Sequence, residues 1–349
     1  MKRFWNLDFG FWIGSGRKRI VYLAVCTVLI ALCSPTDAQQ TTKISRVGVL
    51  FIGGRNQPHL EAFKQGLRER GYIEGKNITL EYRYAEGKID RLPLLATELV
   101  QLNVNVIVTT ADSAARAATK ATKTIPIVLT TGADLVKSGL AESLAKPGGN
   151  VTGLSVLEEN LSAKRLELLK EAFPKATQVA YLWNPGAVPY ASAADSTPAN
   201  PSFAQAKALA QALALQLRSY EVRAPSEIEK AFADMSKARP DALLVVLSPL
   251  ITLNSKRIVE LALEQRLPGM YPTNQFAEEG GLMAYGPRIG DMYRRAATYV
   301  DKILKGEKPA ELPVEQPMKF DFIINLKTAK QIGLTIPPNV LARADRVIK

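Results

Sequence analysis

The segment Arg46-Val47-Gly48-Val49-Leu50-Phe51-Ile52 decides the fold, because this apolar run is followed by the turn residues Gly53-Gly54 and then by an amphipathic helix. In that helix, predicted over 59–70, apolar residues recur every third or fourth position and share one face. An apolar strand that leads into an amphipathic helix begins a βαβ unit, whose strands lie parallel in a sheet covered by helices on both faces.

The same unit recurs along the rest of the chain, with a break at Pro147-Gly148-Gly149 after which the pattern starts again. Strands are predicted over 46–52, 78–83, 104–110, 126–131, 179–183, 242–248, 282–285 and 319–325. Helices are predicted near 59–70, 90–103, from 112 onward, around 140, and over 162–173, 203–217, 228–237, 254–266 and 292–305. Two successive sets of such units in 349 residues predict an α/β protein of two similar lobes.

The first 38 residues have the layout of a secretory signal peptide. Basic residues end at Arg17-Lys18-Arg19, an apolar run extends from Ile20 to Cys33, and small residues at 36 and 38 mark a cleavage site. As a helix the run would span about 21 Å, short of the roughly 30 Å of a bilayer core. We therefore expect cleavage after Ala38 and a periplasmic protein, with an uncleaved membrane anchor as the alternative.

Both cysteines, Cys26 and Cys33, lie inside this segment. A chain that begins at Gln39 therefore has no disulfide, no thiolate metal site and no cysteine nucleophile. Cys33 would carry the lipid if the protein were a lipoprotein, but Leu32 stands where that signal requires a small residue. We expect a form without a lipid anchor.

The formal net charge of +12 raises the question of nucleic acid as a partner. The basic residues are scattered among acids, as in Lys164-Arg165-Glu167-Lys170, and form no basic run after the signal segment. The distribution therefore argues against nucleic-acid binding.

Signals of catalysis are almost absent. His59 is the only histidine, which excludes two-histidine zinc motifs, and we expect it to be exposed at a helix start. Gly53-Gly54-Arg55-Asn56 lacks the Gly-Lys-Ser/Thr ending of a phosphate-binding loop. The adjacent carboxylates Glu158-Glu159 and Glu278-Glu279 are predicted to lie on solvated faces or turns. We expect a binding protein without catalytic residues, cofactor or metal site.

Candidate binding residues follow the strands, because ligands of open α/β sheets bind beyond the carboxyl ends of the strands. In the first half these residues lie directly before helices, whose free N–H groups could hold an anion. For each of these residues, the alternative role is to cap the helix that it precedes. The candidates are Gly54, Asn56, Thr110, Asp112, Ser113, Thr131 and Asp134.

In the second half, aromatic and polar residues follow the predicted strands. Aromatic walls with a few polar groups are typical of small-molecule pockets, although packing in the core or at a hinge would also account for the aromatic residues. The candidates are Asn184, Ser248, Tyr271 and Tyr285.

From Arg46 to the C-terminus the chain resembles the ABC-transporter substrate-binding protein family that includes tryptophan- and tyrosine-type binders. The resemblance is carried jointly by several motifs. They are Arg46-Val47-Gly48-Val49-Leu50, Phe63-Lys64-Gln65-Gly66-Leu67, Gly71-Tyr72-Ile73-Glu74-Gly75-Lys76-Asn77, the segment from Ser143 to Gly153 around Pro147-Gly148-Gly149, Gly280-Gly281-Leu282-Met283-Ala284-Tyr285-Gly286, Tyr293-Arg294-Arg295-Ala296-Ala297, Asn325-Leu326-Lys327-Thr328-Ala329-Lys330, and Arg343-Ala344-Asp345.

The resemblance implies a type I periplasmic-binding fold, in which two Rossmann-like lobes with parallel sheets are joined by a multi-strand hinge. It implies that 44–157 plus roughly 287–349 form lobe 1 and that 158–286 form lobe 2. The same resemblance places Tyr271, Phe276 and Tyr285 near the hinge and cleft.

The resemblance also matches Asp134 to an aspartate that could engage the ammonium group of an amino acid. Leu135 stands where the family usually has proline, and the Pro185–Pro201 loop is longer than usual, so the family's ligand does not transfer automatically.

The implied function is the extracytoplasmic solute-binding component of an ABC importer, a monomer that captures a small molecule and presents it to a membrane permease. An amino acid is the first expectation for the ligand, followed by an aromatic or other organic acid. A ligand-sensing regulator of the same fold is an alternative, but it would need a DNA-binding segment where the signal peptide stands. An extracytoplasmic α/β enzyme is the remaining alternative.

Overall fold

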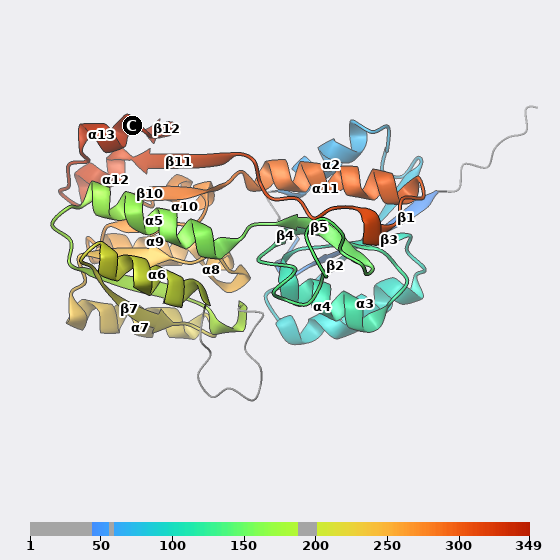
Figure 1. Ribbon diagram of the computed structural model, residues 1–349, viewed down its shortest axis with the longest axis horizontal. Helices are drawn as coiled ribbons and strands as arrows, with labels where there is room; N and C mark the ends of the chain where they lie inside the picture. Colours follow the sequence, from blue (N-terminus) through green and yellow to red (C-terminus); the bar gives the residue numbers. More distant parts are fainter. Residues whose placement is uncertain (1–43, 56–58, 188–200) are drawn as a thin grey trace, which may run out of the picture. The chain divides into compact units, whose positions relative to one another are not determined.

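The computed structural model describes residues 44–55, 59–187 and 201–349 (Figure 1). The predicted signal peptide, Asn56 and residues 188–200 of the predicted long loop lie outside these ranges. The described chain forms two sheets, and helices cover both faces of each (Figure 1).

The first sheet is built around β1 (Ser45–Phe51), the strand predicted from the opening segment. Val47 and Val49 of β1 enter one core and Leu50 enters the other, so the strand is buried on both faces. Neighbouring strands of this sheet pair in parallel. In sheet order they are β2 (Ile78–Tyr84), β1, β3 (Val106–Thr109), β4 (Ile127–Gly132) and β5 (Val151–Ser155).

Two helices from opposite ends of the sequence, α2 (Leu60–Arg68) and α11 (Ile289–Leu304), lie side by side on one face of this sheet (Figure 1). The other face is covered by α3 (Leu92–Gln101) and α4 (Ala111–Ala121). Short 3-10 turns lie at Ile89–Arg91 and Pro309–Glu311.

The second sheet is mixed. Its neighbouring strands pair in parallel except β10 and β11, which are antiparallel. In sheet order the strands are β12 (Arg346–Ile348), β11 (Phe320–Asn325), β10 (Met283–Pro287), β9 (Gly269–Tyr271), β8 (Ala242–Val245), β6 (Gln178–Trp183) and β7 (Gln216–Glu221).

Helices again cover both faces of this sheet. One core is closed by α5 (Glu158–Ala172), α6 (Pro201–Ala212), α12 (Leu326–Gln331) and α13 (Pro338–Leu341). The other is closed by α7 (Ser226–Ala238), α8 (Pro249–Leu253), α9 (Ser255–Glu264) and α10 (Asn274–Glu278). A 3-10 turn lies at Pro185–Ala187.

The chain crosses between the two sheets at 156–157, at 288 and at 316–319. The last crossing corrects the predicted boundaries, because 287–349 does not return as a whole to the first lobe. Residues 289–315 pack on the first sheet, whereas β11 and β12 extend the second. Phe322 and Ile324 of β11 fill one core of that sheet and Ile323 fills the other, which gives this strand two buried faces there.

Several predicted elements differ from the structure. The helix predicted over 203–217 ends at Ala212, since Ala214 adopts a left-handed φ of 53°, and β7 follows. The helix predicted around 140 is a series of turns over 135–139. Strands β5, β7, β9 and β12 were not predicted, because they are short, contain glycine or are largely exposed.

The contact between α2 and α11 can be tested by adding one methyl group. A Cβ at Gly66 would lie 2.5 Å from the backbone oxygen of Arg294 and 2.8 Å from Cβ of Ala297. We therefore expect Gly66→Ala to lower the free energy of unfolding by about 1–3 kcal/mol, as overpacked cores do.

The matched control is Gly290→Ala on α11, where a Cβ would meet nothing nearer than Ala62 at 3.9 Å. This change should be neutral or slightly stabilising, because alanine favours helix. Urea unfolding followed by circular dichroism measures both variants, and an equal loss of stability in the two would contradict the packing described.

Candidate functional site

The carboxyl edge of the first sheet brings two of the predicted loops together. Thr110 precedes α4 as its N-cap residue, but its side chain makes no capping hydrogen bond. Ala111, the first helical residue, has a left-handed φ of 58°, which is a strained conformation for a residue with a side chain. Helix α4 therefore begins with a sharp turn and with N–H groups that no capping side chain satisfies.

Asp112 joins this helix start to the loop after β4. Its Oδ1 accepts a hydrogen bond of 3.1 Å from the backbone N–H of Ala133. The side chain is buried, at 6% relative exposure, and Oδ2 has no hydrogen-bond partner among the described residues. Burial raises the pKa of the Asp112 carboxyl to about 6, while the bond from Ala133 and the positive charge of Arg116 act in the opposite direction.

Thr109, the last residue of β3, carries a second unsatisfied group of this region. Its hydroxyl is buried and makes no hydrogen bond within the described chain. The hydroxyl of Thr130 at the end of β4 donates to the backbone oxygen of Thr109 at 3.2 Å. This hydrogen bond joins the ends of β3 and β4. Two buried oxygens beside them, Oγ1 of Thr109 and Oδ2 of Asp112, have no hydrogen-bond partner among the described residues.

Asp134 shapes its own loop. Its Oδ1 accepts hydrogen bonds of 3.0 Å from the N–H groups of both Val136 and Lys137, so one carboxylate oxygen closes a turn. Leu135, at the position where proline was expected, is fully buried in the core beneath α4, and its backbone oxygen accepts from Leu140 and Ala141. The leucine therefore anchors the loop by packing.

The remaining predicted residues of this edge are Gly54, Ser113 and Thr131, which are half-buried, and Asn56, which lies outside the described residues. Gly54 follows β1 and Thr131 lies near the end of β4, on either side of β3 in the parallel sheet, so the topology places their loops at the same edge.

In the second lobe, the structure assigns local roles to two predicted polar residues. Ser248 accepts a hydrogen bond of 3.2 Å from the N–H of Ile251 and so caps α8. Asn184 is buried and its Oδ1 accepts from the N–H of Gly186 at 2.7 Å. In this structure Ser248 therefore acts as a helix cap and Asn184 closes a turn.

The predicted aromatic residues divide into two groups. Tyr271 and Phe276 are stacked on each other with ring centroids 5.2 Å apart, and both are buried in the core beneath α7 and α9. Their rings thus present no surface to a ligand in this structure. Tyr285 is half-buried in the middle of β10 and stacks on Phe320, with ring centroids 5.9 Å apart.

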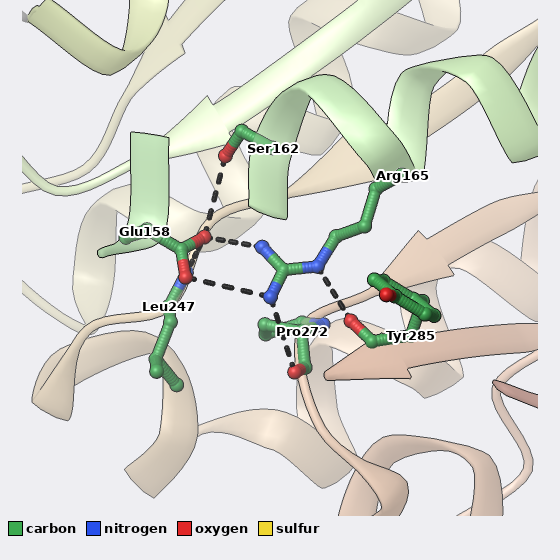
Figure 2. A network of polar contacts seen from close by, with 6 residues as sticks. All are labelled: Glu158, Ser162, Arg165, Leu247, Pro272 and Tyr285. Carbon is green, nitrogen blue, oxygen red and sulfur yellow. Dashed lines mark hydrogen bonds and ion pairs between the residues drawn. The ribbon is translucent and has the colours of Figure 1, made fainter. Parts of the chain in front are cut away.

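An ion pair that the sequence did not reveal joins the ends of the second-lobe strands (Figure 2). Arg165 of α5 is completely buried, and its guanidinium forms an ion pair with Glu158, which is 8% exposed. Its Nε also donates to the backbone oxygen of Tyr285 at 2.7 Å, and Nη2 donates to that of Pro272 at 3.3 Å.

Glu158 is satisfied from its other side (Figure 2). Its Oε1 accepts from the hydroxyl of Ser162 at 3.3 Å and from the N–H of Leu247 at 3.4 Å. The prediction that Glu158 lies on a solvated face was therefore wrong. Helical spacing could have shown it, because Glu158 and Arg165 are seven residues apart and share the face of the buried Leu161 and Leu169.

His59 is half-buried instead of exposed, and its ring centroid lies 5.5 Å from that of Tyr293. Burial lowers the pKa of His59 below its ordinary value. Across 44–55, 59–187 and 201–349, no group of three or more histidine, cysteine or acidic side chains could hold a metal ion. Within those same ranges, every helix is too short or too polar to cross a membrane.

A hollow of about 730 Å³ lies between β7 and α7, away from the loops described above. Its charged side chains pair largely with one another, as Arg223 does with Glu221 and Lys237 with Asp234. The strand-end loops, which carry unsatisfied buried groups, remain the better candidate site.

Comparison with known proteins gives a consistent result. Residues 55–348 match the family model described as ABC transporter substrate binding protein. A tyrosine-binding protein of Clostridioides difficile (strain R20291) is 27% identical over 335 residues, which cover 91% of this chain and 93% of that protein.

Two solved structures share the fold and at least a quarter of the aligned residues. A conserved domain protein from Vibrio cholerae has a TM-score of 0.79 at 29% identity, covering 87% of this chain and 100% of its own. An ABC domain from Streptococcus pneumonia in complex with L-Trp has a TM-score of 0.77 at 26% identity, covering 87% and 99%.

The buried ion pair yields a stability prediction. Arg165→Met should lower the free energy of unfolding by about 3–5 kcal/mol, because Glu158 is then left as a buried charge without its partner. The double variant Arg165→Met/Glu158→Gln should recover part of that loss, since glutamine keeps an acceptor for Ser162 without the charge.

Arg257→Met is the control, because Arg257 pairs with Glu229 on the exposed surface. It should leave the unfolding midpoint unchanged. Chemical denaturation of the four proteins tests the set; a double variant as unstable as Arg165→Met alone would show that the uncompensated charge is not the cause.

Asp112 yields a prediction about pH. Its folded-state pKa of about 6 lies above the ordinary 3.8, so ionisation of Asp112 opposes folding. Relative to Asp112→Asn, the ligand-free wild type should therefore gain up to about 3 kcal/mol of stability as pH falls from 7.5 toward 4. Urea unfolding at several pH values measures this difference, and parallel profiles for the two proteins would contradict it.

Proposed function

Since this chain belongs to the ABC transporter substrate-binding protein family, with two lobes of the type I periplasmic-binding fold, we propose that it delivers an aromatic amino acid to an importer. The observation that carries the proposal is the edge of the first sheet, where a helix start without a side-chain cap lies beside the loop of Asp134. Such an edge offers complementary partners for the two charged groups of an amino acid.

The carboxylate of the ligand would bind at the start of α4. Backbone N–H groups of a first helical turn and the positive end of the helix dipole favour an anion. Thr110 supports this assignment because its side chain makes no capping bond, and Ser113 lies in the same turn. These N–H groups are pre-organised, so they require little rearrangement when the ligand arrives.

The ammonium group of the ligand would bind at Asp134. The turn formed by Oδ1 with Val136 and Lys137 holds this carboxylate in a fixed orientation. A charge-assisted hydrogen bond to a carboxylate is stronger than one between neutral groups. The pairing of an anion site with a cation site favours an amino acid over an organic acid.

An aromatic side chain is supported by two relatives, a tyrosine-binding protein and a domain in complex with L-Trp. Of the three predicted aromatic residues, only Tyr285 has a partly exposed side chain, whereas Tyr271 and Phe276 are buried in the core. Tyr285 lies three residues before the crossing between the lobes at 288, so a ligand ring stacked on it would lie close to the hinge.

The protein would work outside the cytoplasm, as the family's function requires. In this proposal it acts as a monomer and meets its membrane permease with both lobes closed on the ligand. Closure by bending at the connections between lobes is the usual motion of periplasmic binding proteins. Removal of the first 38 residues by signal peptidase would release it into the periplasm.

Isothermal titration calorimetry with L-tyrosine, L-tryptophan and their deaminated acids tests the substrate class. We expect both amino acids to bind and Asp134→Asn to weaken them about 5- to 150-fold, equivalent to about 1–3 kcal/mol, because the charge-assisted bond is lost. The asparagine retains an acceptor for the turn, so the melting temperature should stay near that of the wild type.

Asp90→Asn, which removes an exposed carboxylate from the same lobe, is the control and should bind as the wild type does. Equal affinity of Asp134→Asn and wild type would remove Asp134 from the site. Binding of the deaminated acids in preference to the amino acids would overturn the proposed substrate class.

A further inference from the structure

Tyr84 is an aromatic residue at the carboxyl edge of the first sheet that was not among the predicted binding residues. It is the last residue of β2 and pairs in register with Phe51, the last residue of β1. Its side chain is half-buried, and its ring centroid lies 6.3 Å from that of Phe51. A partly exposed ring at the strand ends can offer its uncovered surface to a ligand.

A second tyrosine holds the ring of Tyr84 in place. The two rings of Tyr82 and Tyr84 are stacked, with centroids 5.9 Å apart and planes 3° from parallel. Tyr82 is fixed in turn, because its hydroxyl donates to Glu74 at 3.2 Å and the ammonium group of Lys64 lies 5.4 Å from its ring centroid. A ligand ring could therefore stack on Tyr84 with little rearrangement of the protein.

Open space lies at Gly54, three residues after the end of β1. Among the described residues, a Cβ at Gly54 would meet no atom within 4 Å beyond its chain neighbours. In the sheet order β2-β1-β3, β1 lies between the strand that ends in Tyr84 and the strand that leads to Thr110 and α4. Neighbouring strands are about 4.8 Å apart, so β2 and β3 are separated by about 10 Å. An aromatic amino acid can cover this span from its carboxylate to its ring.

We propose that the aromatic ring of the ligand occupies the space at Gly54 and stacks on the ring of Tyr84. This inference rests on the proposed function: with its carboxylate at the start of α4, the ligand extends its side chain across the end of β1 toward β2. Tyr285 of the second lobe packs against the same core as Tyr84, so it can cover the other face of the ligand ring. Gly54 and Tyr84 then determine the specificity for an aromatic side chain, because the glycine leaves room for the ring and the tyrosine supplies the stacking surface.

Gly54→Val tests the open space. Gly54 has no left-handed φ and a Cβ there is unobstructed, so valine should leave the urea midpoint unchanged. The added side chain should weaken the binding of L-tyrosine and L-tryptophan at least about tenfold in isothermal titration calorimetry, because it takes up the volume of the ligand ring.

Gly149→Val is the matched control. A Cβ at Gly149 also meets nothing within 4 Å, and this exposed residue of the same lobe lies before β5, at the opposite edge of the sheet. This variant should bind both amino acids as the wild type does.

Tyr84→Leu tests the stacking surface. Leucine can keep an apolar contact with Phe51 but has no aromatic face, so L-tyrosine should bind about 3- to 10-fold more weakly. Tyr84→Phe retains the ring and should restore the wild-type affinity. The comparison of these two variants separates the loss of stacking from the loss of the hydroxyl.

Each outcome has a definite meaning. Wild-type affinity for both amino acids in either Gly54→Val or Tyr84→Leu overturns the ring site and leaves the proposed function intact. A loss in Tyr84→Phe as large as that in Tyr84→Leu also overturns it. If Tyr84→Leu does not fold, Gly54→Val alone decides. Absence of binding of both L-tyrosine and L-tryptophan by the wild type overturns the proposed function and the ring site with it.

Discussion

The buried ion pair between Arg165 and Glu158 is the constraint on which the second lobe depends. Two charges removed from water are tolerated only when their remaining donors and acceptors are satisfied, and here backbone groups after β8 and β9 and within β10 complete the network. Gly286 allows this arrangement, since a Cβ there would lie 1.9 Å from the oxygen of Pro272. Because Glu158 follows one crossing between the lobes and Tyr285 precedes another, a single network anchors both crossings in the second lobe.

Much of the fold could be predicted from the sequence, because the buried strands are long apolar runs and most helices carry a regular apolar stripe. Strand β1 and helix α2 lie within a few residues of their predicted positions. Strands β9 and β12, of three residues each, were missed because periodicity needs more residues to appear. The pairing of β11 with β10 could not be foreseen either, since a strand with two apolar faces suits either sheet.

The candidate site was predicted only as a set of loops. Topology correctly indicates that residues after parallel strands meet at one edge, and Asp112 and Ala133 do meet there. Residue type alone could not separate Tyr285 from Tyr271, because both are tyrosines of neighbouring strands and only packing decides which ring is covered. Arg165 and Glu158 were overlooked for a related reason: charged residues are usually solvated, and their helical register was not weighed against that expectation.

The three crossings of the chain between the lobes also constrain how the protein can be divided into fragments. The first lobe is assembled from two separate stretches of chain, and the second receives its last two strands only after the chain has visited the first. The first lobe therefore lacks α11 until the chain has been made as far as Leu304, and a clone that ended after β5 would leave the face of the first sheet that α11 covers exposed. The two lobes are therefore not separable as independent domains by a single cut in the chain.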